Sequence, residues 1–316
     1  MLIRFLLGAM IASCAGAAQA EAFKIASPNR GSWEGAIPEM GKQAGIFKKH
    51  GLDLDIIYTS GGGETMQVVI SGSVDVGLSA GLAGALGAYA KGAPIRIVGA
   101  SSSGGREVFY YVPAASPLKS LREASGKSIA YSTTGSSTHI GALRWIKEYD
   151  LKGAKITPTG DAATTTTQAL TGQVDIGWSV GPFNLDRIEK GEIRMIGQLS
   201  DSPHMRAQTI RVQIANSAAI AARPDAFRRY LQAYQETLDW MYASPDAVKI
   251  YMGIVEFPES SVRRTINEFI TKDTLQIDKV LGIPEAMEDA VQFKFIAEPL
   301  SEKQLAELIQ IDALKK

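Results

Sequence analysis

The sequence lacks most of the side chains on which catalytic and metal sites are built. Among its 316 residues there are three histidines and a single cysteine, Cys14. After residue 14 the chain therefore has no disulfide, no thiolate nucleophile and no Cys-ligated metal. No His, Asp or Glu cluster has metal-ligand spacing, and no Gly-x-x-x-x-Gly-Lys-Ser/Thr loop is present. We expect neither a metal nor a cofactor, and the chain is not a P-loop ATPase.

Net charge and long apolar runs are absent too. Lys and Arg together number 33 and balance 33 Asp and Glu. This balance gives no electrostatic reason to expect nucleic acid or an acidic membrane surface as a partner. After residue 20 the most apolar run is 77–90, which is shorter than the ~18 residues of a membrane span. We interpret it as a buried helix.

The first twenty residues have the pattern of a secretory signal. Arg4 is followed by an apolar stretch at 5–11 and by Ala-Gln-Ala at 18–20, which predicts cleavage before Glu21. We therefore expect an exported protein. Residues 11–14 (IASC) also fit a lipoprotein cleavage site with lipid on Cys14, and that alternative stays open.

The chain contains one motif twice. Residues 68–81 read VVISGSVDVGLSAG and residues 168–181 read QALTGQVDIGWSVG, an offset of 100 residues. Two copies are too few for a solenoid and suit two similar α/β lobes. In each copy a glycine, Gly72 or Gly172, ends a helix, and a short strand follows. We place Ser79 and Ser179 at the starts of the helices after these strands.

Strand-like and helix-like segments alternate through the first two thirds of the chain. We predict strands at 24–26, 52–58, 74–78, 95–100, 128–131 and 174–178, and helices at 33–49 and 137–149. This order predicts an α/β fold with two mostly parallel sheets flanked by helices. Ligands of such sheets bind where strands end and loops lead into helices.

Two extended runs flank the second copy and differ from the other strands. They are 107–112 (EVFYYV) and 208–212 (QTIRV), and we interpret them as a two-strand hinge. Lobe 1 then comprises 21–106 and 213–316, with lobe 2, residues 107–212, inserted into it. Beyond Asn216 we predict helices, with an apolar face of Phe227, Leu231, Tyr234, Leu238 and Met241, a helix start at Ser244-Pro245 and a capping box of Ser301 with Gln304.

Several motifs together resemble one family. Residues 45–54 (GIFKKHGLDL) are similar to a stretch of the nitrate/sulfonate/taurine-type periplasmic solute-binding proteins. The Gly-x-Val-Asp repeats fit that family, as do residues 116–121 (SPLKSL), Gly126-Lys127 and the Gly-Ser run at 135–137. The resemblance extends from about Ile25 to Asp246.

The resemblance implies a two-lobed, type II-like periplasmic binding protein that closes about a hinge. Such a protein delivers its ligand to the permease and ATPase subunits of an ABC importer. Family members bind sulfonates, taurine, nitrate, bicarbonate, aromatic carboxylates or pyrimidine precursors. One eukaryotic branch makes a thiamin pyrimidine with a cysteine cluster, which this chain lacks. We therefore expect a monomeric, periplasmic, non-enzymatic binding protein for a small organic anion; a sensing subunit for a membrane receptor remains the alternative.

The loop from Thr134 to Thr138 is the first candidate for ligand contact. Gly135 permits close approach of a ligand to the backbone, and Ser136, Ser137 and Thr138 add hydroxyls at a helix start that favours anions. The competing interpretation is an ordinary Ser/Thr cap. The family position favours ligand contact.

Further candidates lie at other loop ends. They are Gly61, Ser79 and Ala80 in lobe 1, Trp178 and Ser179 in lobe 2, Trp33 as a flat apolar wall, and Arg30 and Asp161 as polar partners. Arg106, Arg211 and Glu64 are further charged candidates, and each of them also suits a solvated surface position. Ser79 and Ser179 alternatively cap helices, and Trp33 alternatively packs in the core.

One pattern favours an enzyme. Residues 177–181 (GWSVG) match the Gly-x-Ser-x-Gly elbow of serine hydrolases, with Ser179 as nucleophile. A serine nucleophile needs a histidine base, and His204 is the last histidine of the chain, close after the elbow. The same pattern also occurs at 77–81. We therefore keep the hydrolase only as a minor alternative.

Overall fold

The computed structural model describes residues 20–311. The predicted signal, apart from Ala20, and Cys14 with its alternative lipid attachment lie outside the described residues. Within the described part, no helix combines the length and apolar character needed to cross a membrane.

The first sheet has five strands in the order β2-β1-β3-β10-β4. They are β1 (Glu21–Pro28), β2 (Leu52–Thr59), β3 (Val76–Gly81), β4 (Ile95–Ser103) and β10 (Thr209–Asn216). β10 is antiparallel to both its neighbours, so the other four strands share one direction. Helices α1 (Ile37–Gln43), α2 (Ile46–Lys49), α3 (Gly62–Ile70) and α4 (Leu82–Ala90) connect them. We call this unit lobe 1.

The second sheet repeats that order. It contains β5 (Val108–Pro113), β6 (Ser128–Tyr131), β7 (Lys155–Pro158), β8 (Gly177–Val180) and β9 (Ile193–Gln198). β8-β5-β9 form one ladder and β6-β7 another, and backbone bonds between Ile176 and its partners Ser128 and Ala130 join the two. With α5 (Ser137–Glu148), α6 (Ala162–Leu170), α7 (Leu185–Glu189) and α8 (Pro203–Arg206) it forms lobe 2.

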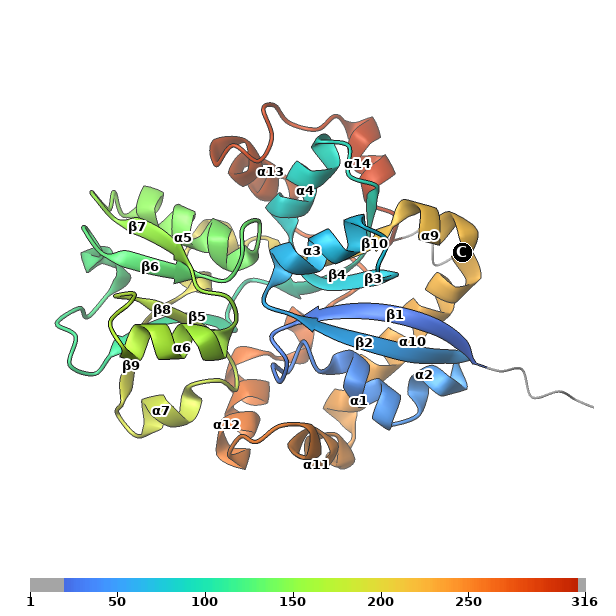
Figure 1. Ribbon diagram of the computed structural model, residues 1–316, viewed down its shortest axis with the longest axis horizontal. Helices are drawn as coiled ribbons and strands as arrows, with labels where there is room; N and C mark the ends of the chain where they lie inside the picture. Colours follow the sequence, from blue (N-terminus) through green and yellow to red (C-terminus); the bar gives the residue numbers. More distant parts are fainter. Residues whose placement is uncertain (1–19, 312–316) are drawn as a thin grey trace, which may run out of the picture.

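The two sheets have the same strand order, β2-β1-β3-β10-β4 against β7-β6-β8-β5-β9, with one antiparallel strand in each. The antiparallel strands β10 and β5 come from the two runs predicted as the hinge, and the chain passes between the lobes beside them (Figure 1). The predicted α/β fold with mostly parallel strand directions is confirmed. The residue boundaries of the lobes stay a prediction.

The repeated strands begin later than predicted, at Val76 and Gly177 rather than at 74 and 174. In both copies the aspartate before the strand bonds to the neighbouring strand through its side chain. The Asp75 carboxylate accepts a hydrogen bond from the Lys24 N–H at 2.8 Å, and that of Asp175 accepts one from the Ser128 N–H at 2.9 Å. The run 77–90, expected to be a helix, is the end of β3 followed by α4.

Beyond β10 the chain is helical, as predicted. The helices are α9 (Ser217–Ala222), α10 (Pro224–Ala243), α11 (Pro245–Ile254), α12 (Glu259–Arg264), α13 (Ile283–Gln292) and α14 (Glu302–Leu308). The predicted apolar face of α10 is buried from Phe227 to Met241. Ser244 caps α11, and Ser301 with Gln304 forms the capping box of α14.

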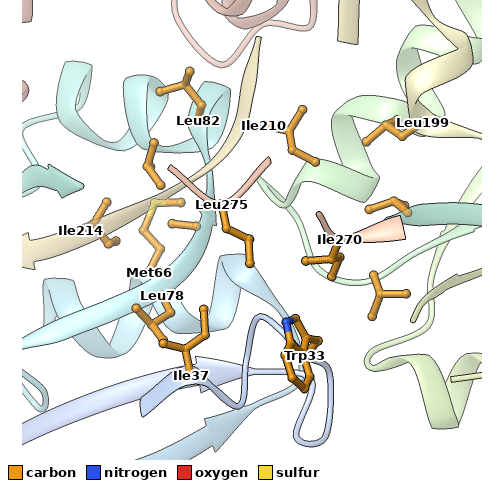
Figure 2. Close-up of a cluster of buried hydrophobic side chains, with 14 of the residues drawn as sticks. Trp33, Ile37, Met66, Leu78, Leu82, Leu199, Ile210, Ile214, Ile270 and Leu275 are labelled. Carbon is orange, nitrogen blue, oxygen red and sulfur yellow. The ribbon is translucent and has the colours of Figure 1, made fainter. Parts of the chain in front are cut away.

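This C-terminal region, which the prediction assigns to lobe 1, contacts both lobes. The Phe269 ring lies 5.8 Å from that of Phe109 in lobe 2. Ile270 and Leu275 lie in the buried cluster between Met66 of α3 and Leu199 after β9 (Figure 2). The apolar core therefore continues from one lobe to the other along the C-terminal segment.

Candidate functional site

A small cavity of about 20 Å³ lies where the two sheets meet. Its lining comes from strand ends and helix starts of both lobes: Pro28, Asn29, Gly62, Ser79 and Arg211 from lobe 1, and Val108, Ser132, Ser136, Ser137, Thr138, Trp178 and Val180 from lobe 2. This is the place where α/β sheets bind ligands. The space is about enough for one water molecule. It is far below the roughly 300–1,000 Å³ of small-molecule sites, so the lobes must move apart to admit a ligand of that size.

The lobe 2 wall is the start of helix α5. Ser136 is its N-cap and accepts the His139 N–H at 3.2 Å, while Thr138 Oγ1 accepts the Ser132 N–H at 2.9 Å. Ser137 lines the cavity and has no side-chain hydrogen bond to any described residue. The free N–H groups of a helix start attract negative charge. This wall therefore presents hydrogen-bond donors.

His139 supports this loop from behind. The Gly135 N–H donates to His139 Nδ1 at 3.1 Å, and the imidazole stacks on Tyr131 with ring centres 4.5 Å apart. Gly135 has φ +85°, a conformation that other residues rarely adopt. Burial lowers the pKa of His139 to about 4, so the ring is neutral near pH 7 and keeps Nδ1 as an acceptor.

The apolar part of the lobe 2 wall consists of Val108, Val180 and the Trp178 side chain. The indole N–H of Trp178 donates to Thr159 Oγ1 at 3.3 Å, which fixes the ring. Trp178 is almost wholly buried. A fixed aromatic wall of this kind suits the hydrocarbon part of a small ligand.

The lobe 1 wall is centred on Ser79 at the end of β3. Ser79 has φ +55°, an uncommon value for a residue other than glycine, and such strain is often found at binding sites. Its hydroxyl donates to Glu34 Oε1 at 2.7 Å. A side chain on the adjoining Gly62 would lie 2.4 Å from the Ser79 carbonyl oxygen. This close packing of α3 against β3 keeps Ser79 at the cavity surface.

Behind this wall is a buried charge cluster. The Arg211 guanidinium donates to the carboxylates of Glu34 and Glu107, and the Ser102 hydroxyl also donates to Glu107. All three charged side chains are at least nine-tenths buried. Burial raises the pKa of Glu34, which Arg211 lowers in part and Glu107 raises further.

Unsatisfied polar atoms also gather here. Of the eight buried side-chain N or O atoms without a hydrogen-bond partner in the described residues, Asn29 Oδ1 and Arg211 Nε belong to lining residues, and Glu107 Oε2 belongs to the charge cluster behind them. Buried polar groups in proteins are nearly always paired. A ligand in the cavity would supply partners for the two atoms of the lining residues.

The lobes touch directly beside the cavity. The Gly63 N–H of α3 donates to Thr133 Oγ1 of lobe 2 at 2.9 Å. A Cβ atom on Gly84 of α4 would lie 2.2 Å from the Gly135 carbonyl oxygen, and one on Gly63 would lie 2.1 Å from that of Thr134. Glycines thus allow backbone from one lobe to lie against backbone from the other, which makes this a closed arrangement.

The structure brings five of the predicted site residues to the cavity: Ser79, Ser136, Ser137, Thr138 and Trp178. Three others support it without lining it. Gly61 packs on the side chains of Ser132 and Thr133, Gly135 holds the α5 loop, and Ala80 is buried in β3 beside Ser79. Thr134 is exposed, and its backbone carbonyl faces Gly63.

Other predicted residues lie elsewhere. Trp33 is fully buried, donates to the Tyr242 hydroxyl at 3.1 Å and packs on Tyr251. Arg30 is exposed over the Tyr58 ring. Asp161 caps α6 by accepting the Thr164 N–H at 2.7 Å. None of these three lines the cavity, and each side chain is engaged elsewhere; their contact with a ligand stays a prediction.

Ser79 and Ser179 lie inside strands β3 and β8, not at helix starts as predicted, because each strand continues past the serine. Ser179 does not line the cavity; it is fully buried, donates to the Phe183 carbonyl at 3.2 Å and accepts from Asn184 at 3.2 Å. His204 contacts the Glu285 carbonyl and Asp289. Within residues 20–311 no histidine is a partner of Ser179, so the hydrolase arrangement is not formed there.

Sequence reasoning left several lining residues out of the candidate set. They are Pro28, Asn29, Gly62, Ser132, Val108 and Val180. Pro28 ends β1 and Asn29 follows it, so the rule that ligands bind at strand ends applies to both residues as it does to Ser79. Arg211, one of the charged candidates, does line the cavity; it lies in a crossing strand that returns from lobe 2, where no local pattern indicates which way its side chain points.

Comparison with known proteins agrees with this architecture. The family described as NMT1/THI5 like matches residues 39–248, more than half of the chain. The 4-amino-5-hydroxymethyl-2-methylpyrimidine phosphate synthase THI5 of Saccharomyces cerevisiae is 22% identical over 223 residues, which are 67% of this chain. The chain spans 64% of the length of that relative.

Solved structures extend the likeness to nearly the whole chain. The alkanesulfonate-binding protein SsuA from Xanthomonas axonopodis pv. citri, bound to MOPS, has a TM-score of 0.77 at 18% identity, covering 93% of this chain and 99% of its own. The periplasmic nitrate-binding protein NrtA from Synechocystis PCC 6803 has a TM-score of 0.71 at 12% identity, covering 93% and 87%. The shared fold is that of periplasmic binding proteins, and the chain belongs to the NMT1/THI5-like family.

Proposed function

We propose that this protein is the exported solute-binding component of an ABC importer. It holds a small organic acid, a sulfonate or a carboxylate, between its two lobes. The observation that carries the proposal is the small cavity lined by both lobes, with two unpartnered polar atoms on its lining residues. The acidic end of the ligand lies at the α5 start, beside Ser136, Ser137 and Thr138, where N–H groups and hydroxyls donate.

Ligand binding in this proposal acts through closure of the lobes. In an open form the lobe 1 half-site (Gly62, Ser79 and Arg211) and the lobe 2 half-site (Ser136–Thr138 and Trp178) are separated. A ligand that contacts both half-sites binds the closed form more tightly and raises its population. The permease and ATPase of the importer then recognise the closed shape of a periplasmic, monomeric protein.

The curated relatives bear an enzyme name, so an activity on a pyrimidine is the second candidate. The chain has no cysteine after residue 14, whereas the thiamin-pyrimidine branch that it resembles carries a cysteine cluster. The residues around the cavity also contain no histidine; His139 lies behind the loop. These features favour binding without turnover. A sensing subunit for a membrane receptor shares the same binding step.

The test is a ligand screen on the chain from Glu21 onward. Sulfonates, aliphatic and aromatic carboxylates, nitrate and pyrimidines are each added in a thermal-shift assay. A ligand at 100 times its dissociation constant stabilises the fold by about 2.7 kcal/mol. X-ray scattering of each hit should show compaction, and mass spectrometry should recover the compound unchanged. Turnover of a hit, or no hit in the whole screen, contradicts the proposal.

A further inference from the structure

A second pocket, which we call the crossing pocket, lies where the chain passes between the lobes. Its volume of about 420 Å³ is within the range of roughly 300–1,000 Å³ for small-molecule sites. Its lining includes Ser103, Gly104 and Arg106 of the first crossing segment, Arg206 just before the second, and Ser200 and Asp201 after β9. The crossing pocket shares no lining residue with the cavity between the lobes.

Two arginines of the crossing pocket have no partner. Every other arginine within residues 20–311 has an ion pair, a side-chain hydrogen bond or an aromatic ring as its partner. Among these described residues, Arg106 and Arg206 have none of the three. Both side chains are exposed, and both line the same pocket. Two like charges that share a pocket repel each other, and an anion between them removes that repulsion.

The backbone that carries the two arginines is held in place. The Gly104 N–H donates to the Gln208 carbonyl at 3.0 Å, and the Gln198 side chain donates to the Arg106 carbonyl at 2.8 Å. Gly104 has φ +80°, and a Cβ atom there would lie 3.7 Å from the Arg206 carbonyl oxygen. The turn that carries the first arginine therefore lies against the residue that carries the second. A fixed backbone of this kind lowers the cost of ordering when a ligand binds.

The other polar groups of the pocket leave it positively charged. Asp201 Oδ2 accepts the Gln198 N–H at 2.7 Å, and no ion pair among the described residues joins Asp201 to either arginine. Two guanidinium groups and one carboxylate leave one positive charge in excess on the lining. The Ser200 hydroxyl has no hydrogen-bond partner in residues 20–311. The pocket thus offers a ligand several N–H donors and one hydroxyl donor.

We propose that the crossing pocket binds a small oxyanion with two negative charges, of which inorganic phosphate is the simplest. Arg106 and Arg206 contact its oxygens, and Ser200 donates a further hydrogen bond. Guanidinium groups bind such oxyanions through paired N–H donors, and two of them match a dianion in charge. The bound anion links the first crossing segment to the residue before the second.

The assignment also gives Arg106 a place in the molecule. Its charge makes it a candidate partner of an acidic ligand, but it does not line the cavity between the lobes. In the crossing pocket the same guanidinium has a second one beside it. The anion site is therefore separate from the solute site of the proposed function and does not depend on it.

The test is a titration of the isotope-labelled chain from Glu21 onward with sodium phosphate at mildly alkaline pH, followed by two-dimensional NMR. Sodium chloride keeps the ionic strength constant, so that screening of surface charges does not change. Saturable shifts should appear at the amides of Arg106, Ser200 and Arg206. Sodium sulfate, which has the same shape and charge, should give the same pattern, and sodium chloride alone should not.

Variants then locate the site. Arg106→Gln and Arg206→Gln should each weaken phosphate binding at least about fivefold, because each loses charge-assisted hydrogen bonds that are partly exposed to water. Asp201→Asn removes the competing negative charge but keeps an oxygen for the Gln198 N–H, and it should tighten binding several-fold. Arg122→Gln is the matched control, because Arg122 is an exposed arginine outside the pocket, and it should leave binding unchanged. Melting of each variant without phosphate checks that it is folded.

Several results would overturn the anion site. Shifts confined to the start of α5 would place the anion in the cavity between the lobes instead. An equal loss of binding in Arg122→Gln would mean that overall charge, and not a site, attracts phosphate. No saturable shift, or a pattern that chloride reproduces, also removes the site. Each of these results leaves the solute-binding proposal standing, since that proposal is tested by the separate ligand screen.

Discussion

At the residue scale, the site contains two kinds of hydroxyl side chain: those that cap a helix and those that are free to bind a ligand. Ser136 is engaged as the N-cap of α5, whereas Ser137 next to it has no side-chain partner among the described residues. Both line the cavity. Loss of the first hydroxyl should therefore affect folding and binding, and loss of the second should affect binding alone.

We expect Ser137→Ala to weaken ligand binding several-fold, corresponding to about 1 kcal/mol for one hydrogen bond, with unchanged unfolding. Ser136→Ala should also lower the free energy of unfolding by about 1 kcal/mol through loss of the cap. Ser301→Ala, which removes the cap of the distant α14, should reproduce the stability loss without a binding loss. Calorimetry and chemical denaturation measure the two effects. Unchanged affinity in Ser137→Ala would remove this hydroxyl from the site.

A second prediction at this scale concerns His139, whose pKa is lowered to about 4 by burial. As the pH falls, the unfolded chain binds a proton on this residue near pH 6.5, whereas the folded chain binds it only near pH 4. The stability that depends on neutral His139 is therefore complete above about pH 6.5 and is lost as the pH falls toward 4. His139→Gln keeps an acceptor for the Gly135 N–H and does not titrate. Between pH 6.5 and 4 the unfolding free energy of this variant should fall less than that of the unchanged protein. The difference should be roughly 2 kcal/mol after allowance for partial exposure of the ring. Parallel slopes for the two proteins would contradict the assignment.

At the scale of elements, the contact between α4 and the α5 loop depends on glycine. Gly84 lies against the Gly135 carbonyl of the other lobe, so a methyl group there collides with backbone when the lobes are closed. An open form does not contain this contact. The substitution should therefore act on closure rather than on folding.

We expect Gly84→Ala to lower the apparent ligand affinity at least about tenfold, since each 1.4 kcal/mol taken from the closed form reduces binding tenfold. The folded protein should be as stable as before or more so, because alanine favours a helix over glycine by up to about 1 kcal/mol. Gly253→Ala in α11, where a Cβ meets nothing within 4 Å, is the control and should raise stability without affecting affinity. X-ray scattering with ligand should show Gly84→Ala more open. Full compaction would contradict this mechanism.

At the scale of the whole molecule, the C-terminal region couples the lobes. Arg144 of α5 donates to Asp289 of α13, and Asp289 also accepts from Gln208 at 2.9 Å, next to the crossing strand β10. Asp289 is fully buried, and α13 packs on α4 of lobe 1. The ion pair thus fixes lobe 2, the crossing segment and the C-terminal helices together.

Removal of Asp289 should destabilise the entire protein. Asp289→Ala leaves the buried Arg144 charge with only the more distant carboxylates of Glu148, at 4.0 Å, and Glu288, at 3.9 Å. We therefore expect a loss of about 3 kcal/mol in the free energy of unfolding, at the low end for a broken buried pair. Asp225→Ala, which breaks the surface ion pairs with Arg228 and Arg229 on α10, should have little effect. Urea denaturation followed by circular dichroism measures both. A small loss in Asp289→Ala would mean that water or another group replaces the carboxylate.

Periodicity and local spacing were sufficient to predict most elements and the pairing of two similar sheets. Three of these signals depend only on residues close together in the chain or on a fixed spacing, so they can be recognised from the sequence alone. They are the hundred-residue repeat, the α10 face from Phe227 to Met241 and the cap at Ser301. The exact strand starts were not predictable, because they depend on pairing with strands that are distant in sequence, to which the carboxylates of Asp75 and Asp175 also bond.

The sequence by itself determined the α/β class, the family, and the placement of hydroxyl-rich loops at strand ends. The tertiary structure decided which of those residues meet. It brought Ser79, Arg211 and Ser137 together from segments far apart in the chain, placed Ser179 and Trp33 in the interior, and left Arg211 shared between two buried acids. Direction and burial of a side chain depend on how the lobes pack, and charge balance depends on which groups share a desolvated space. Neither property is encoded in local spacing.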